Sequence, residues 1–260
     1  MRLGMPFLLE NGSVESACAL CAELGLGFVE LNGSFPTCLA EKLNAAELMR
    51  LKEKYGVGFT FHLPEMADPF AFDAPVQHAW RLVVRDFLQL AKDVGAPVVN
   101  MHLPRGVYIT LPQGRTYINM QYGIEYMAAV NSFRDAVDAM LRGTGTRLCI
   151  ENTDGFLPHE WNAVDVLLES ECIGLTLDVG HDHGVAGKDL QGVLKRKARL
   201  HHMHLHDAKG AHPHLALGDG EIDLQARIAL AEETQSTVVL ETKTVAALRQ
   251  SLAWLAARGL

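Results

Sequence analysis

The stretch Leu200–Gly220 reads LHHMHLHDAKGAHPHLALGDG and holds six of the twelve histidines of the chain. Its first part predicts a β-strand over residues 200–206, in which successive side chains point to opposite faces. Apolar side chains then lie on one face and three imidazoles on the other. Those imidazoles belong to His202, His204 and His206. A row of imidazoles that ends at Asp207 is hard to explain by packing and indicates the edge of a metal site.

Outward from this stretch, short apolar runs alternate with helical repeats along the whole chain. The expected strands are residues 2–9, 28–31, 58–62, 97–102, 147–151, 173–178, 200–206 and 237–241. The expected helices follow them, one capped by Ser13 and ending near Gly25, the others at about 45–55, 80–91, 123–141, 159–170, 190–198, 224–233 and 245–257. Eight strand–helix units without a linker predict an α/β fold, a single (β/α)8 barrel domain over residues 1–260. A doubly wound sheet would need a glycine-rich phosphate loop after the first strand, and none is there.

The composition limits the class of protein. The net charge of −8 weighs against a nucleic-acid partner, because affinity for phosphates depends largely on Lys and Arg. The sequence has no run of about 18 apolar residues, so we expect no membrane-spanning helix. The five cysteines include one CxxC, Cys18 and Cys21, without a second pair to complete a zinc site. We expect small buried side chains in a reducing compartment and, since residues 1–10 do not resemble a signal peptide, a cytoplasmic protein.

Polar residues gather where the expected strands end, which is where (β/α)8 barrels carry their active sites. Six consecutive strands end on or beside a possible metal ligand, and these residues are His62, His102, Glu151, Asp178, His204 and Glu241. Each of the histidines alone could be a hydrogen-bonded structural residue, and Glu151 alone could cap a helix. Together, however, buried carboxylates that face one another resist ionisation unless a cation lies between them. We therefore expect a divalent metal, with mixed His and carboxylate ligands that suit Zn²⁺, Mn²⁺ or Co²⁺.

Seven short motifs occur at these positions. They are HLP (His62–Pro64), HLPRG (His102–Gly106), CIENTDG (Cys149–Gly155), LTLDVGH (Leu175–His181), HMHLHDAKG (His202–Gly210), HLALGDGEIDL (His214–Leu224) and VVLET (Val238–Thr242). In this order, and over essentially the whole chain, they resemble the xylose-isomerase-like TIM-barrel superfamily. That superfamily includes sugar isomerases, ketose epimerases and the endonuclease IV type of apurinic endonuclease.

The resemblance implies a set of metal ligands. The superfamily's common metal would be held by Glu151, Asp178, His204 and Glu241. The endonuclease branch binds two further ions, whose ligands correspond to His62 and His102 for one, and to His181, His212 and His214 for the other. His212 stands where that branch has an aspartate. The resemblance thus implies one to three divalent ions.

The resemblance also implies the chemistry. A sugar isomerase or epimerase moves a proton or hydride next to a carbonyl, and Glu151 and Glu241 could be its acid and base. His181 would then hydrogen-bond a substrate oxygen, or else bind a third ion. The substrate would be a small sugar or sugar phosphate.

The alternative is an endonuclease IV-like phosphodiester hydrolase acting on abasic DNA. Against it, the endonuclease motifs ENMAGQG and DTCH are ENTDGFL and DVGH here, and residues 32–37 offer no arginine to enter a DNA stack. Another metal-dependent lyase or hydrolase of a small polyol or acid, or a member without activity, also stays open.

The connection over residues 105–122 is unusually long and carries Arg105, Arg115 and three tyrosines. Long connections are often lids, and we expect it to close over the ligand with an arginine that meets a phosphate or carboxylate. The alternative is a packed surface hairpin or an oligomer contact, and a homo-oligomer is possible. Lys243 and Lys209 could likewise pair with a site carboxylate or a substrate anion, or be solvated.

Overall fold

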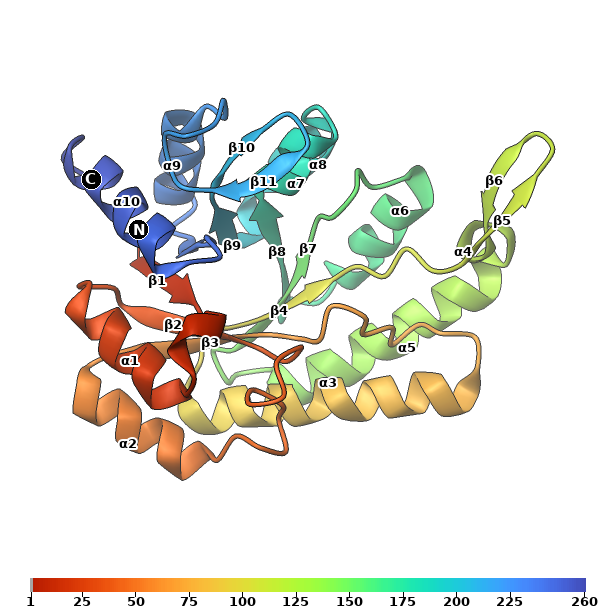
Figure 1. Cartoon of the computed structure of the whole chain (residues 1–260). Helices are drawn as coiled ribbons and strands as arrows, with labels where there is room; N and C mark the ends of the chain where they lie inside the picture. Colours follow the sequence, from red (N-terminus) through yellow and green to blue (C-terminus); the bar gives the residue numbers. More distant parts are fainter. Residues whose placement is uncertain (1) are drawn as a thin grey trace.

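Eight parallel strands close into a barrel in the computed structural model of the chain, which describes residues 2–260 (Figure 1). The order around the barrel is β1, β12, β9, β8, β7, β4, β3 and β2, and the pairing of β1 with β2 closes it. The barrel strands are β1 (Arg2–Pro6), β2 (Phe28–Asn32), β3 (Gly58–His62), β4 (Val98–His102), β7 (Arg147–Glu151), β8 (Ile173–Asp178), β9 (Leu200–Leu205) and β12 (Thr237–Leu240). The predicted (β/α)8 barrel is confirmed.

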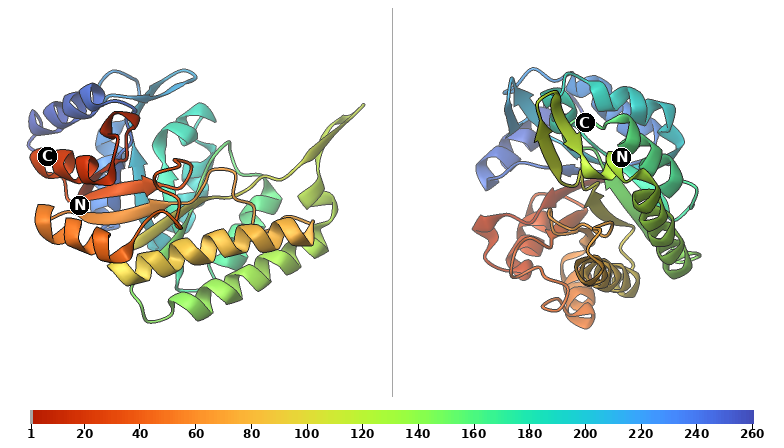
Figure 2. Two further views of the ribbon diagram at one scale, coloured as in Figure 1. Left: turned by 60° about the horizontal axis from the view of Figure 1, so that its bottom comes forward. Right: turned by 90° about the vertical axis from the view of Figure 1, so that its right-hand side faces the viewer.

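Helices follow the strands and cover the outside of the barrel (Figures 1 and 2). They are α1 (Val14–Glu23), α2 (Ala45–Tyr55), α3 (Ala74–Val94), α4 (Ile118–Gln121), α5 (Gly123–Leu141), α6 (Pro158–Leu167), α7 (Val179–Gly184), α8 (Lys188–Lys195), α9 (Leu224–Glu233) and α10 (Val245–Ala256), with short 3-10 turns η1 (Leu9–Asn11) and η2 (Lys197–Arg199). The hydroxyl of Ser13 accepts a hydrogen bond from the backbone N–H of Ser16 and caps α1 as predicted. Within residues 2–260, no helix combines the length and apolar character needed to cross a membrane.

Several element bounds differ from those expected. The first strand ends at Pro6 rather than at residue 9, because the chain then turns into η1. The strands expected to reach His206 and Glu241 end one residue earlier, since Leu205 pairs with Leu240 as the last register partners of β9 and β12. Beyond them one backbone hydrogen bond, from the N–H of Glu241 to the Leu205 carbonyl, still links the two segments at the barrel mouth.

The interior of the barrel is polar towards the mouth. The Thr60 hydroxyl donates to Glu30 at 3.0 Å, and the Thr176 hydroxyl donates to Oδ1 of Asn100 at 2.6 Å. These residues come from β2, β3, β4 and β8, so they can meet only inside the barrel. Buried polar groups of this kind are tolerated because each has a hydrogen-bond partner. The barrel thus presents an ordered polar floor below its mouth.

Two hairpins lie outside the barrel sheet. A surface hairpin within residues 105–122 was the expected alternative to a lid, whereas the hairpin after β9 was not predicted. One is formed by β10 (Asp207–Lys209) and β11 (His212–Leu215), and the other by β5 (Tyr108–Leu111) and β6 (Gly114–Tyr117). The second, together with α4, forms what we call the arm, residues 107–122. Figures 1 and 2 show the arm projecting away from the barrel beyond the ends of α3 and α5.

Candidate metal centre

The polar strand ends expected from the sequence lie at one mouth of the barrel. His62, His102, Glu151 and Asp178 are the last residues of β3, β4, β7 and β8, His204 is the next to last of β9, and Glu241 directly follows β12. Strands that run in parallel around a closed barrel necessarily bring these ends together.

His204 lies at the centre of a carboxylate cluster. Its Nδ1 atom is 3.2 Å from Oε1 of Glu151 and 3.3 Å from Oε2 of Glu241, and Oδ2 of Asp178 is 3.8 Å away. One imidazole nitrogen donates at most one hydrogen bond, so it cannot satisfy three carboxylates. Oε2 of Glu241 is buried and has no hydrogen-bond partner among residues 2–260. A divalent cation would satisfy all four groups, and this donor set fits Zn²⁺, Mn²⁺ or Co²⁺.

The charges in the cluster favour the ionised forms of Glu151 and Glu241. Burial opposes ionisation of Glu151, but His204 and His102 keep its pKa well below the ordinary value. Burial likewise opposes protonation of His204, while Glu151, Glu30 and Glu241 raise its pKa well above the ordinary value. A positive charge is therefore strongly favoured at this point. A metal ion that binds here would displace the His204 proton and supply that charge.

A second donor group shares Glu151 with the first. His62 donates from Nδ1 to the Leu63 carbonyl at 2.6 Å, because a carbonyl can only accept, and its Nε2 is left 3.2 Å from Oε2 of Glu151. Nε2 of His102 is 3.4 Å from the same oxygen. A backbone carbonyl that fixes one ring nitrogen so that the other faces the site is typical of metal-binding histidines. This group fits a second divalent ion.

The comparison with protein families agrees with this geometry. A family model described as xylose isomerase-like TIM barrel matches residues 18–258. The chain belongs to this family. No curated protein matches it.

Solved structures of the same fold include sugar epimerases. A D-tagatose 3-epimerase-like protein has a TM-score of 0.79 and 23% identity, with 99% of this chain and 96% of that chain covered. The 3-keto-D-glucoside 4-epimerase YcjR of E. coli has a TM-score of 0.77 and 17% identity, with 99% of both chains covered. A protein from Thermus thermophilus soaked with zinc chloride has a TM-score of 0.70 and 24% identity, with 99% and 97% covered. At these identities the similarity establishes the fold.

In this xylose isomerase-like barrel, the residues expected to hold a third ion form no single donor group within residues 2–260. His212 is exposed on β11 and belongs to none of the metal-donor groups found within residues 2–260. Nδ1 of His214 lies 3.7 Å from Oε2 of Glu241, and burial lowers the pKa of His214 to about 4. His181 donates from Nδ1 to the Asn152 carbonyl at 3.0 Å, which leaves its Nε2 free, and its ring centroid lies 6.3 Å from that of His214. Of the predicted third set, His181 and His214 are therefore near each other at the mouth, while His212 is apart from them.

His206 stands beside His214 instead, with ring centroids 4.3 Å apart. The backbone N–H of His214 donates to Nδ1 of His206 at 2.8 Å, so that nitrogen is unprotonated and Nε2 carries the proton. Nε2 lies 3.3 Å from both carboxylate oxygens of Asp178. His206 thus orients Asp178, and with His214 and Glu241 it also forms one of the metal-donor groups found within residues 2–260. Gly180 makes the room, because a Cβ there would lie 1.9 Å from Cε1 of His206.

Two further residues of the histidine-rich stretch Leu200–Gly220 have structural roles. His202 lies deeper in the barrel, with Nε2 2.9 Å from Oε2 of Glu30. Asp207 accepts hydrogen bonds from the backbone N–H groups of Ala208, Gly218 and Ile222, and so fixes the loop that carries His214. The row of imidazoles therefore contains two residues that face the carboxylate cluster, His204 and His206, while His202 lies below it.

The three residues predicted to bind substrate lie in different settings. Lys243 is beside the centre, with Nζ 2.7 Å from Oε1 of Glu241. Lys209 is exposed on β10, outside the donor groups. Arg105 is 3.2 Å from the buried Glu160 and also donates to the Gly155 carbonyl at 2.8 Å. Arg105 therefore joins two loops, and its guanidinium is not free to meet a substrate anion.

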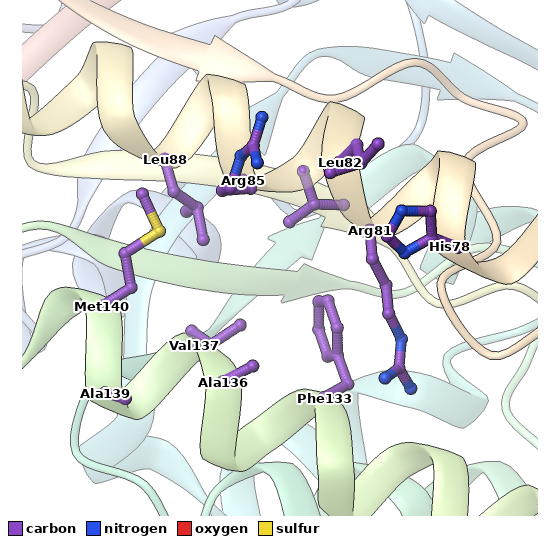
Figure 3. Close-up of a pocket in the computed structure, with 11 residues that line it drawn as sticks. His78, Arg81, Leu82, Arg85, Leu88, Phe133, Ala136, Val137, Ala139 and Met140 are labelled. Carbon is purple, nitrogen blue, oxygen red and sulfur yellow. The ribbon is translucent and has the colours of Figure 1, made fainter.

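Two of the cavities at the mouth border the predicted ligands most closely. One of about 260 Å³ is lined by Phe7, Phe35, His62, Glu241 and Lys243 among others. The other, of about 610 Å³, lies beside Trp80, His102 and His181. A third hollow, of about 460 Å³, lies far from the strand ends between α3 and α5, and Figure 3 shows the aliphatic and aromatic side chains that face it. It has no carboxylate in its lining, so the metal chemistry belongs to the mouth.

Sequence reasoning missed two supports of the centre. Oε1 of Glu30, on β2, is 2.8 Å from Nε2 of His204, on the side of the ring away from the carboxylate cluster. Asn100, on β4, donates from its side-chain amide to Oε2 of Glu151. A lone acidic residue inside the apolar strand FVELN is the one signal that could have singled out Glu30. No feature of the sequence marks Asn100 as a partner of Glu151, because the two residues meet only when β4 pairs with β7.

Proposed function

We propose that this protein is a divalent-metal-dependent isomerase or epimerase of a small sugar or sugar phosphate, acting in the cytoplasm. The observation that carries the proposal is the meeting of Glu151, Asp178, His204 and Glu241 at the barrel mouth. The fold shared with two proteins described as sugar epimerases supports the choice of substrate class.

Glu151 and Glu241 are suited to be the acid–base pair. They come from β7 and from the end of β12, which β8 and β9 separate in the barrel, so they approach the centre from different sides. One carboxylate would take the proton from the carbon beside the carbonyl, and the other would return a proton to the opposite face. Asn100 holds Glu151 and Lys243 holds Glu241, so both are positioned before substrate arrives.

A bound divalent ion would polarise the substrate oxygens and stabilise negative charge that develops on them. Nε2 of His181 is available for a hydrogen bond to a substrate oxygen, because Nδ1 is engaged by Asn152. Lys243 is the cation best placed to meet a substrate anion. The donor groups suit one or two ions of Zn²⁺, Mn²⁺ or Co²⁺.

The group of His62, His102 and Glu151 favours a second candidate function, metal-assisted hydrolysis. Two ions that share one carboxylate can activate the attacking and leaving oxygens of a phosphoester. An abasic DNA duplex, or a small phosphorylated polyol, would be the substrate. The basic surface that DNA requires is not evident in a chain of net charge −8.

Metal analysis combined with turnover of two substrate panels tests the proposal. The protein, loaded in turn with Zn²⁺, Mn²⁺ or Co²⁺, is assayed on a panel of ketoses and ketose phosphates in deuterated water, and on an abasic duplex. We expect deuterium to enter a sugar at the carbon next to the carbonyl. Cleavage of the duplex without any sugar turnover would reverse the order of the two candidates.

A further inference from the structure

The arm exposes an apolar surface that its own barrel does not cover. Its exposed large side chains are Val107, Tyr108, Ile109, Leu111, Met120 and Tyr122. Val107 is 71% exposed and Ile109 is 52% exposed. The Phe72 ring, itself exposed, continues the surface with its centroid 6.0 Å from that of Tyr122. Apolar surface gathered in this way marks an interaction site more often than free surface.

The strands of the arm also lack lateral partners. β5 and β6 form a two-stranded sheet of their own, and β5 carries no charged residue. An isolated hairpin is marginally stable in water, and monomers usually protect an open strand edge with charge or proline. Figures 1 and 2 show this hairpin standing clear of the body of the protein. The arm is therefore built to pack against something outside its own barrel.

The charge of the arm limits the kind of surface that it can bind. Residues 105–122 contain no Asp or Glu, in a chain whose net charge is −8. Arg105 is engaged by Glu160, but Arg115 is exposed beside the turn of the hairpin. Its guanidinium lies 4.6 Å from the ring centroid of Tyr108, and no carboxylate within residues 2–260 lies within 4.0 Å of it. The arm is thus apolar along its length, and its tip carries the positive charge of Arg115.

The mouth cavity of about 610 Å³ has the complementary character. Met66, Val76 and Trp80 supply apolar lining. The carboxylates of Glu65, Asp68 and Asp154 also line it, against one guanidinium, that of Arg105, which Glu160 already engages. Over the described chain, no Lys, Arg or His lies within 4.0 Å of the Glu65 or Asp68 carboxylate, and burial raises the pKa of Asp68. Of the arm, residues 107–122, only Val107 at its base lines this cavity, so the chain's own hairpin does not fill it.

We propose that two copies of this chain form a dimer by exchanging arms. The tip of each arm, Leu111–Arg115, enters the mouth cavity of the partner, where Arg115 meets Glu65 and Asp68. Both complementary surfaces are on one chain, so a reciprocal exchange about a two-fold axis closes the assembly at two subunits. The cavity adjoins His102 and His181, and each mouth is therefore completed by its partner. This inference does not depend on which reaction the site performs.

Sedimentation velocity over a range of concentrations gives the first test. The wild-type protein is expected to be a dimer, and Ile109→Glu combined with Leu111→Glu is expected to raise the dimer dissociation constant about 100-fold or more, since burial of each side chain contributes at least tenfold. Leu194→Glu, at a comparably exposed leucine on α8, is the matched control and is expected to stay dimeric. Circular dichroism checks that all variants fold. A wild-type protein that is monomeric throughout, or a control as disrupted as the arm variant, would overturn the proposal.

Disulfide trapping tests whether the tip of the arm binds in the partner's cavity or elsewhere. The five native cysteines are buried, so exposed replacements can be oxidised selectively. We expect Glu65→Cys and Arg115→Cys proteins carrying different tags to form a covalent heterodimer when mixed and oxidised. A Glu65→Cys/Arg115→Cys protein that closes only within one chain would show the arm to be a lid on its own site. Crosslinking of Arg115→Cys with itself alone, or no crosslinking at all, would also refute the exchange.

Discussion

Replacement of Glu241 by glutamine is the sharpest test of the metal centre. Oε1 of Glu241 contacts Nζ of Lys243 at 2.7 Å, while the partnerless Oε2 lies 3.3 Å from Nδ1 of His204. Glutamine keeps the shape of the side chain and can keep an oxygen near the lysine. It removes the negative charge, which the metal and the acid–base step both need.

The magnitude follows from ligand linkage. A metal present at 100 times its dissociation constant stabilises the folded protein by about 2.7 kcal/mol. If loss of the Glu241 charge weakens binding about 100-fold, the same metal concentration stabilises by only about 0.4 kcal/mol. For a chain of this size, the difference corresponds to roughly 5–9 °C of metal-induced shift in Tm. At saturating metal, kcat should still fall by about 10²–10⁴, the usual contribution of an acid or base.

The assay is a thermal melt of wild type and variant with and without Zn²⁺, Mn²⁺ or Co²⁺, followed by competition with a chelating dye and by turnover. Glu53→Gln is the control, because Glu53 is exposed on α2 and belongs to no metal-donor group of the described chain. The metal-free Tm of both variants should stay near that of wild type. A Glu241→Gln protein with the full metal-induced shift and wild-type kcat would refute both roles.

Three other substitutions probe the supports of the centre. Glu30→Gln should weaken metal binding 10- to 100-fold, as loss of an outer partner of a ligand usually does, and dye competition measures it; unchanged affinity would make Glu30 purely structural. Gly180→Ala should displace His206, which lowers the free energy of unfolding in urea by about 1–3 kcal/mol and weakens metal binding. A variant with wild-type stability and metal affinity would contradict the 1.9 Å approach of a Cβ to His206. Arg105→Ala should leave the buried Glu160 unpaired and cost about 3 kcal/mol of unfolding free energy. A raised KM for phosphorylated ketoses at unchanged stability would instead restore Arg105 as an anion-binding residue.

The barrel could be predicted because its signals are local. Gly58–His62, Arg147–Glu151 and Ile173–Asp178 have the bounds expected from their apolar runs. The helices Ala45–Tyr55 and Leu224–Glu233 likewise agree with their expected ranges. Once eight such units are recognised, the parallel arrangement of the strands implies that their carboxyl ends meet. That is why the residues around His204 could be named before any coordinate was known.

The partners behind the ligands could not be named in this way. His206 and His212 both looked like members of the histidine-rich mouth, yet one supports Asp178 and the other is exposed on a hairpin. The difference arises from the turn after β9 and from the space at Gly180, which no spacing in the sequence encodes. Glu30 and Asn100 depend on the register of β2 and β4 against strands far away in the chain.

The amino-acid sequence by itself determined the order of strands and helices, the residues at the strand ends and hence the position of the candidate site, because periodicity and strand direction are properties of short segments. Only the tertiary structure decided which imidazole nitrogen faces a carboxylate, which arginine is already engaged, and that the arm leaves its own cavity open. Those outcomes depend on distances of a few ångströms between segments that are remote in the chain, and closure of the barrel sets these distances.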